Sequence, residues 1–228
     1  MPTALIARAD ALGIHAFRCY GSTEHPTISS GTPQDPLEKR QFTDGRPTPG
    51  TRIRVVDSDG QDLPCGVDGE ILCRGPETFL GYRDPALDGE TWLRDDAGET
   101  WLRTGDIGNL DAEGYLTVTD RAKDVIIRAG ETISSREVED VLLTCPGVAD
   151  AAVIAVPDDY YGEKVGAVIV PTPGAVPTLE SVREHFAGCG LAKQKTPEYV
   201  ELRSELPRTP IGKVRKADLR AELRAALV

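Results

Sequence analysis

The sequence predicts an α+β protein in two parts: a small antiparallel β-barrel or sandwich, followed by a compact α+β domain. Two observations support this prediction. Between residues 45 and 119, short β-prone stretches are separated by turn residues, and after residue 120 helical and strand patterns alternate. The length of 228 residues, with 39% hydrophobic and 28% charged residues, suits one large or two small globular domains.

The first half is expected to form strands joined by tight turns. Residues 52–56 (RIRVV) lead into an Asp/Gly-rich turn, residues 70–75 (EILCRG) follow, and residues 114–119 (GYLTVT) come after another such turn. Aromatic and β-branched residues dominate and no 3.6-residue period persists, which favours an all-β segment.

The tetrapeptide TWLR occurs twice in this half, at residues 91–94 and 100–103, with DDAGE between the copies. Two strand-prone tetrapeptides around an Asp/Gly-rich connection predict a β-hairpin. A duplicated functional unit is the alternative. Only the second copy continues into Thr104-Gly105-Asp106.

The second half is expected to alternate strands with helices. A capping-box pattern at Ser134 to Glu137 opens one helix, and Pro146-Gly147 ends it. The order β-α-β-β-α-β-α implies a compact α+β domain of about a hundred residues. The strands are expected at 124–128, 151–156, 165–170 and 198–202, and the inward helix residues are Val138, Val141, Leu142, Leu179, Val182, Phe186, Leu219, Leu223 and Leu227.

The net charge of −11 is distributed unevenly. From Arg121 onward there are 15 basic and 16 acidic residues, so the first 120 residues hold nearly all of the excess negative charge. Residues 193–228 are basic, with nine basic and five acidic residues. An acidic body argues against general nucleic-acid binding, and a basic end suits a small anionic ligand.

The sequence also gives expectations about location and metals. The longest apolar stretches are far too short to span a bilayer, and the N-terminus has no signal-peptide pattern. Five cysteines without a C-x-x-C motif favour reduced thiols and a cytoplasmic protein. Three scattered histidines predict no metal cluster.

Four short stretches carry chemically suggestive residues, spread from position 20 to position 216. In this order and spacing they resemble the adenylate-forming superfamily, which contains acyl-CoA synthetases, the adenylation domains of peptide synthetases and firefly-type luciferases. Each stretch alone is weak evidence, and the four together are strong. They are Tyr20-Gly21-Ser22-Thr23-Glu24, Trp101-Leu102-Arg103-Thr104-Gly105-Asp106, the group at 114–131 that contains Gly114-Tyr115-Leu116, Asp120-Arg121-Ala122-Lys123-Asp124 and Ala129-Gly130-Glu131, and Pro207-Arg208-Thr209-Pro210-Ile211-Gly212-Lys213-Val214-Arg215-Lys216.

The resemblance covers essentially the whole chain and implies its domains. Residues 1–120 are similar to the C-terminal part of the family's large domain, with a remnant of the α/β core at 1–41 and the β-barrel at 42–119. Residues 121–228 are similar to the small, mobile C-terminal AMP-binding domain. Family members are more than twice this length, so the phosphate loop, the adenine loop and most of the acyl pocket are expected in a missing N-terminal part of the same enzyme.

The resemblance implies a two-step reaction on ATP, a carboxylic acid and coenzyme A, with Mg²⁺. The carboxylate attacks the α-phosphorus of ATP, giving acyl-AMP and pyrophosphate, and the CoA thiol then takes the acyl group. Because the first step joins two anions, it needs fixed cations and hydrogen-bond donors at the α-phosphate.

Lys213 is the expected main cation, bridging the substrate carboxylate and the α-phosphate as the family's matching lysine does. A solvated surface charge is the alternative. A Walker-type loop is excluded, because Pro207 and Val214 stand where that motif needs Gly and Ser or Thr. The context of Lys213 also resembles the site at which bacterial acyl-CoA synthetases are acetylated, so a protein acetyltransferase is an expected partner.

Asp106 is expected to hold the ribose. A carboxylate has two acceptor oxygens, which match the vicinal hydroxyls of that sugar. A turn-capping aspartate is the alternative. By resemblance, Glu24 ligates Mg²⁺, Thr23 hydrogen-bonds the α-phosphate, and Tyr20 lies against the adenine, with Gly21 in the same nucleotide-binding turn.

Three further positions take their expected roles from the resemblance. Arg121 would bind the ribose or a phosphate, with a salt bridge to a neighbouring aspartate as the alternative. Lys123 matches the family's hinge, about which the small domain swings between the two steps. Gly130 belongs to the stretch presented to the pantetheine channel, where Ala129 departs from the Gly-Gly of many relatives. His25 is a candidate for facing the acyl group, with an ordinary exposed histidine as the alternative.

The leading interpretation is an AMP-forming carboxylate–CoA ligase of which this chain is a part that is inactive alone. The sequence of the barrel and hinge segments favours this class. A peptide-synthetase adenylation domain or an acyl-AMP ligase is the alternative within the superfamily. A non-catalytic nucleotide- or partner-binding module is the alternative from another class. The sequence does not name the acid.

Overall fold

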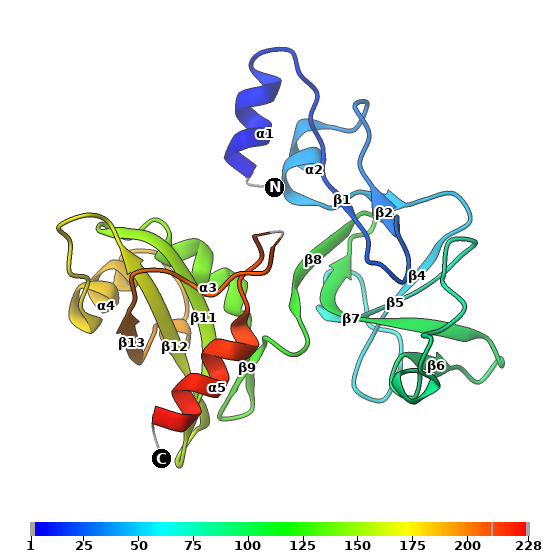
Figure 1. Cartoon of the computed structure of the whole chain (residues 1–228). Coiled ribbons are helices and arrows are strands. Elements are labelled where there is room, and N and C mark those ends of the chain that lie inside the picture. Colours follow the sequence, from blue (N-terminus) through cyan, green and yellow to red (C-terminus); the bar gives the residue numbers. More distant parts are fainter. Residues whose placement is uncertain (1–2, 211, 227–228) are drawn as a thin grey trace. The chain divides into compact units, whose positions relative to one another are not determined.

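The computed structural model describes residues 3–210 and 212–226, and the chain divides into two compact units, Met1–Ala122 and Lys123–Val228. Figure 1 shows both units, each of which is described by itself here. The α+β class expected from the sequence is confirmed, with antiparallel sheets in both units.

The first unit begins with two helices and a small antiparallel sheet. The helices are α1 (Thr3–Asp10) and α2 (Leu37–Phe42), and the strands β1 (Cys19–Tyr20), β2 (Ser29–Ser30) and β3 (Arg46–Pro47) pair in that order. The buried guanidinium of Arg40 in α2 ties the helices together, because it pairs with Asp10 of α1 and donates to the Ala16 carbonyl at 3.1 Å.

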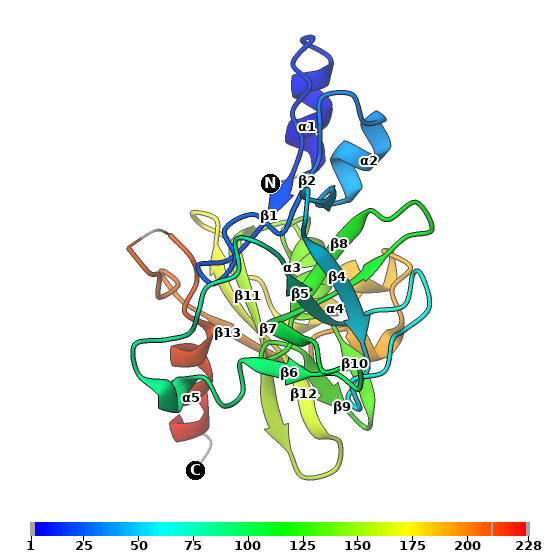
Figure 2. The ribbon, with the colours of Figure 1, turned by 90° about the vertical axis from the view of Figure 1, so that its right-hand side faces the viewer.

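The second sheet of this unit is antiparallel and open. Its strands are β4 (Arg52–Val56), β5 (Gly69–Arg74), β6 (Trp92–Arg94), β7 (Thr100–Leu110) and β8 (Leu116–Arg121), with the short helix η1 (Pro85–Leu87) before β6. The order is β4-β5-β7-β6, and β8 pairs with the far half of β7, as Figure 2 shows. Within the described residues no pairing closes this sheet, so the barrel form of the sequence prediction is wrong.

The repeated TWLR forms the predicted hairpin. Trp92 pairs with Leu102 and Arg94 with Thr100, so the first copy becomes β6 and the second begins β7. The long strand β7 serves two partners in succession, since its first residues pair with β6 and its last with β8. The second copy of TWLR therefore continues along β7 as far as Asp106.

The second unit is a five-stranded sheet with helices on both faces. The pairing order is β10-β9-β12-β11, and β13 runs parallel to β12. Its elements are β9 (Ile126–Arg128), β10 (Glu131–Ile133), α3 (Ser135–Leu142), β11 (Val148–Asp158), β12 (Gly162–Pro171), α4 (Leu179–Ala187), the short helix η2 (Lys193–Lys195), β13 (Tyr199–Leu202) and α5 (Lys216–Ala226).

Alternate residues of β11 enter two different cores. Val153 faces the core that α3 and α4 supply, while Ile154 faces the core that contains Leu219 and Leu223 of α5. Burial on both faces explains why this strand and β12 are almost wholly apolar in sequence. Leu227, the third expected inward residue of the last helix, lies outside the described residues.

Helix ends follow local side-chain chemistry. The Ser134 side chain accepts from the Glu137 amide at 3.2 Å and begins α3, as predicted. Thr178 and Ser181 form a reciprocal capping box that begins α4. Across residues 3–210 and 212–226, every helix is too short or too polar to cross a membrane.

Candidate functional site

The carboxylate of Asp106 lies at the centre of the best-defined polar group in the first unit. The Tyr20 hydroxyl donates to Asp106 Oδ2 at 2.6 Å, and Arg121 Nε donates to Oδ1 at 3.1 Å. Asp106 is 6% exposed, and it faces Arg121 in the register of β7 and β8. The structure therefore brings together three predicted site residues, of which Tyr20 and Asp106 are 86 positions apart in the sequence.

Burial, and after it the Asp106 carboxylate, raises the pKa of the Tyr20 hydroxyl far above its usual range. Tyr20 therefore stays protonated and remains a donor. The Arg121 side chain is half exposed, so its pairing with Asp106 is open to exchange with a ligand. Arg121 thus forms a salt bridge to Asp106 of the neighbouring strand.

Local chemistry places Asp106 at this point of β7. Gly105 has φ of +69°, a conformation that a side chain disfavours. The Thr104 hydroxyl donates to the Ile71 carbonyl at 2.8 Å and accepts from the Asp106 amide at 3.1 Å. The TGD tripeptide therefore forms a fixed irregularity in the strand.

The turn from Gly21 to Pro26 presents Thr23 and Glu24. It is tight: a Cβ on Gly21 would lie 2.0 Å from the Pro26 carbonyl oxygen, so glycine is required. The Ser22 amide donates to the His25 carbonyl at 3.0 Å. Thr23 is exposed and Glu24 half-buried, so both can meet a ligand.

Glu24 has a partner that sequence reasoning missed. The Tyr82 hydroxyl donates to Glu24 Oε1 at 2.6 Å, and this bond is the main cause of a lowered Glu24 pKa. Glu24 is therefore ionised at neutral pH. The two residues are 58 positions apart, so no local pattern indicates the contact.

His25 is fully buried. Its ring contacts Thr78 and Thr51 inside the unit, and burial lowers its pKa. Both expectations for it, a face toward the acyl group or ordinary exposure, are wrong.

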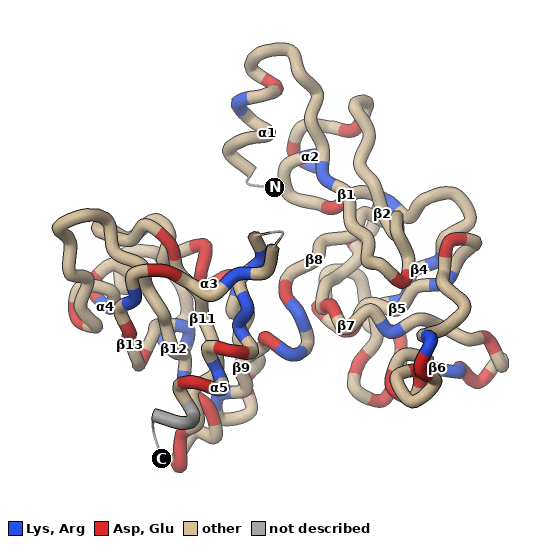
Figure 3. Tube along the Cα trace, viewed as in Figure 1, with Lys and Arg blue, Asp and Glu red and all other residues tan. Residues whose placement is uncertain are grey.

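Lys213 lies in the second unit, on the segment before α5. Arg208 and Val214 form an isolated antiparallel bridge, and the Thr209 amide donates to the Lys213 carbonyl at 2.8 Å. Arg208 also pairs with Asp150 of β11 and donates to the Gly212 carbonyl at 2.6 Å. The Lys213 side chain is exposed, and Figure 3 shows further basic positions on this stretch and along α5.

The expected hinge and channel residues also lie in the second unit. Lys123 is exposed, and its carbonyl accepts from Arg220 of α5 at 3.0 Å. Ala129 has φ of +52° and Gly130 of +84°, so the connection between β9 and β10 is a left-handed turn. Glycine adopts this conformation more easily than the alanine at position 129.

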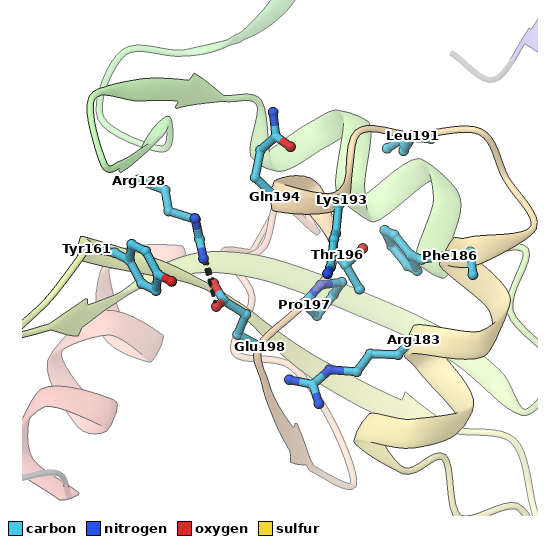
Figure 4. Close-up of a pocket in the computed structure, with 11 residues that line it drawn as sticks. Arg128, Tyr161, Arg183, Phe186, Leu191, Lys193, Gln194, Thr196, Pro197 and Glu198 are labelled. Carbon is cyan, nitrogen blue, oxygen red and sulfur yellow. Dashed lines mark hydrogen bonds and ion pairs between the residues drawn. The ribbon is translucent and has the colours of Figure 1, made fainter.

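A basic pocket of about 710 Å³ lies in the second unit, between α4, the start of β12 and the segment before β13. Figure 4 shows Arg128 and Glu198 paired near its centre, with Tyr161 on one side and Arg183 on the other. Arg183 and Lys193 are exposed at this pocket, and Phe186 and Leu191 add apolar surface. The sequence analysis missed the pocket, because its residues come from four separate segments.

Neither unit holds a ready-made metal cage. Within residues 3–210 and 212–226 no group of three or more His, Cys, Asp or Glu side chains gathers around one point. Glu24 supplies a single half-exposed carboxylate. One carboxylate fits Mg²⁺ that arrives with nucleotide phosphates, since this ion keeps waters and phosphate oxygens among its ligands.

The chain matches two family profiles, described as AMP-binding enzyme over residues 1–83 and AMP-binding enzyme C-terminal domain over residues 137–213. The chain belongs to the adenylate-forming, AMP-binding enzyme family. This confirms the resemblance drawn from the four motifs, and the second profile ends at Lys213.

Similar proteins within the adenylate-forming family are ligases that act on carboxylic acids. The medium-chain fatty-acid–CoA ligase of Escherichia coli K12 is 39% identical over 98% of this chain and 39% of its own length. The o-succinylbenzoate CoA synthetase MenE of Bacillus subtilis, solved with the acyl-adenylate OSB-AMP, has a TM-score of 0.84 at 32% identity over 96% of this chain and 44% of its own. ATP-bound MatB of Rhodopseudomonas palustris has a TM-score of 0.80 at 35% identity, over 90% and 40%.

The chain therefore spans about two fifths of the length of the relatives that it matches. The AMP-binding enzyme profile lies within the first unit, and the C-terminal-domain profile lies within the second. Acyl-CoA ligases and other adenylate-forming enzymes are thus the class of its relatives.

Proposed function

We propose that the chain supplies the ribose-binding carboxylate, a metal-binding carboxylate and the mobile lysine of an acyl-CoA synthetase. In this reaction a carboxylate oxygen attacks the α-phosphorus of ATP and pyrophosphate leaves. The CoA thiol then attacks the acyl carbonyl, and AMP leaves. The observation that carries the proposal is the buried Asp106 carboxylate, held by Tyr20 and Arg121 on the family's motif.

The ribose role of Asp106 is supported by its remaining capacity to accept hydrogen bonds. A carboxylate has about four lone-pair sites. Tyr20 and Arg121 each use one, so two vicinal hydroxyls can bind without displacing Tyr20. Arg121, half exposed, can turn toward a phosphate in the same step. Tyr20 offers its ring to the adenine while its hydroxyl holds Asp106.

The metal role of Glu24 is supported by its chemistry. The lowered pKa keeps the carboxylate ionised, and Tyr82 fixes one of its oxygens. Glu24 would hold Mg²⁺, with Thr23 donating to the α-phosphate. The ion would supply charge neutralisation at the phosphates.

Lys213 would bridge the two anions of the first step. Its backbone is held on both sides by Thr209, and its side chain is exposed and able to reach a ligand. We further propose that the second unit, which begins at Lys123, swings about this residue between steps, which would withdraw Lys213 and present Gly130 to pantetheine. Residues 1–120 would stay part of the large domain during this movement.

The experiment measures the two half-reactions separately in an enzyme that contains this chain. Replacing Lys213 by Ala should lower the formation of acyl-AMP by at least about 100-fold, because one fixed charge at the transition state is worth that much. Thioester formation from supplied acyl-AMP should continue. Equal loss of both steps would contradict the role of Lys213. The 228-residue chain alone should catalyse no pyrophosphate exchange, and robust exchange would overturn the view that it is one part of the enzyme.

The basic pocket suggests where the phosphate-bearing end of CoA binds. Arg183 and Lys193 offer cations, and the partly exposed Tyr161 offers an aromatic side chain at the pocket. The Arg128–Glu198 pair is already satisfied and would shape the pocket.

A further inference from the structure

The ring of His25, the residue after Glu24, takes part in a series of hydrogen bonds. Its Nδ1 lies 2.9 Å from the Thr78 hydroxyl, and its Nε2 lies 3.2 Å from the Thr51 hydroxyl. The imidazole is fully buried, and Cys73 Sγ packs at 3.8 Å from Nδ1. Both nitrogens of this buried ring are thus bonded to side chains of other segments. The ring is therefore a fixed part of this region of the unit.

The bond at Nδ1 is compatible with the ring as acceptor. The Gly75 amide donates to the Thr78 oxygen at 3.0 Å, which leaves the Thr78 hydroxyl proton free to point at Nδ1. The direction of this bond follows once the ring proton is placed on Nε2.

The bond at Nε2 runs the opposite way. The Thr48 hydroxyl donates to the Thr27 carbonyl at 2.7 Å, so its oxygen accepts from Thr51 at 3.0 Å. Thr51 has then used its own proton and accepts from His25 Nε2–H. The network assigns the neutral tautomer with the proton on Nε2, and every member from Thr78 to Thr27 is satisfied.

This series of hydrogen bonds connects three segments of the protein around one turn. It joins the turn that contains His25 to the loop at 48–51 and to the loop at 75–78. The second of these loops is also bonded to Glu24, because the Phe79 amide donates to the Glu24 carbonyl at 2.8 Å. The same turn carries the exposed Thr23 and the half-buried Glu24.

We propose that His25 is a positioning residue that fixes the Thr23–Glu24 turn through the Thr51 and Thr78 hydroxyls and so presets the phosphate- and metal-binding groups. The proposal rests on the proposed function of Thr23 and Glu24. His25 touches no substrate; it acts through the backbone that it shares with Glu24. A catalytic turn held by buried, fully satisfied bonds is preorganised, which reduces the cost of ordering it when a ligand binds.

The alternative is that His25 only fills space in the core. A pair of substitutions at Thr51 separates these views, because Thr51→Val keeps the volume and removes the acceptor for Nε2–H, whereas Thr51→Ser keeps the hydroxyl. Both variants leave the imidazole in place. His25→Phe, which keeps a ring without hydrogen bonds, is the second test of the same network.

The first measurement is nitrogen NMR of the His25 ring in the 228-residue chain. The proposal requires the neutral form with the proton on Nε2. A ring protonated on Nδ1 would overturn the direction of this series of hydrogen bonds and with it the proposal.

The second measurement is amide hydrogen exchange without any ligand. The Ser22 and Phe79 amides report on the turn, since they donate to the His25 and Glu24 carbonyls. Thr51→Val should speed exchange at both by roughly tenfold, as expected for one lost buried hydrogen bond, and Thr51→Ser should not. Amides of β11 and β12 in the other unit are the internal control. If the exchange rates of the Ser22 and Phe79 amides are unchanged in Thr51→Val and His25→Phe, His25 does not anchor the turn and the proposal is overturned.

The third measurement uses Mn²⁺ with ATP, read from paramagnetic broadening of the Thr23 and Glu24 amides. Thr51→Val should weaken this binding by about tenfold relative to Thr51→Ser. Equal binding by both, despite faster exchange in one, would show that the turn is not preset for ligand and would overturn the positioning role. No broadening in the unsubstituted chain would count against the metal role of Glu24, while the exchange result still decides whether His25 is the anchor.

Discussion

The Tyr20–Asp106 hydrogen bond can be tested by a double-mutant cycle. Tyr20→Phe removes only the hydroxyl, Asp106→Ala removes the acceptor, and the double variant removes both. If the bond is formed as described, the two single changes should not add, because either one alone abolishes the same interaction.

The expected coupling follows from the geometry. The bond is short, at 2.6 Å, its acceptor is charged, and Asp106 is only 6% exposed. A hydrogen bond to a charged group contributes about 1.5–3 kcal/mol, so the coupling should be about 2 kcal/mol. The Arg121–Asp106 pair adds little, roughly 0–1 kcal/mol, because the arginine side chain is half exposed.

Urea unfolding followed by tryptophan fluorescence is the suitable assay. Both tryptophans, Trp92 and Trp101, belong to the first unit, so fluorescence reports on the unit that contains the bond. Arg121→Gln is the matched control and should change the free energy of unfolding by less than about 1 kcal/mol. A coupling below roughly 0.5 kcal/mol, which is the usual error of additivity, would refute the buried charged bond on which the Asp106 assignment depends.

Three further predictions test other parts of the reasoning. Because the folded-state pKa of Tyr20 is raised, its stabilising effect is complete below about pH 10 and declines as the pH rises further, so urea titrations should show this loss and Tyr20→Phe should reduce it. Leu142→Ala, in the core between α3 and the sheet, should lower the free energy of unfolding of the second unit by about 2–5 kcal/mol, measured by circular dichroism, and leave the tryptophan transition unchanged. Arg183→Gln should raise the KM for CoA by roughly tenfold in an enzyme containing this chain without changing pyrophosphate exchange, and an unchanged KM would remove the pocket from the CoA site.

Local patterns predicted the elements that depend on local chemistry. Residues 52–56 form β4 with the expected bounds, and the Ser134 cap begins α3 at the next residue. Val138 and Leu142 are buried on the expected helix face. These features are set within a few residues by side-chain alternation, capping and the helical period, so the sequence is sufficient for them.

Features that depend on distant pairing could not be derived in this way. The open form of the second sheet arises because β7 pairs with β6 and then β8 along one side, and strand propensity carries no information about that division. The Tyr82–Glu24 bond and the burial of His25 between Thr51 and Thr78 join residues 26 to 58 positions apart. The basic pocket likewise is lined by Arg128 of β9 and Arg183 of α4, which no local pattern links.

The arrangement around Asp106 also explains how a carboxylate that is proposed to bind a ligand can be held in one orientation before the ligand arrives. A buried carboxylate without hydrogen-bond partners is costly, so such a site needs donors from its own chain. Tyr20 supplies one that stays protonated, and Arg121 supplies a positive charge on an exposed side chain. The first fixes the orientation of the carboxylate, and the second can move away at little cost because it is solvated. In the proposed ribose role, Asp106 would then be an acceptor oriented for two hydroxyls before the nucleotide arrives, which is the condition under which binding needs the least reorganisation.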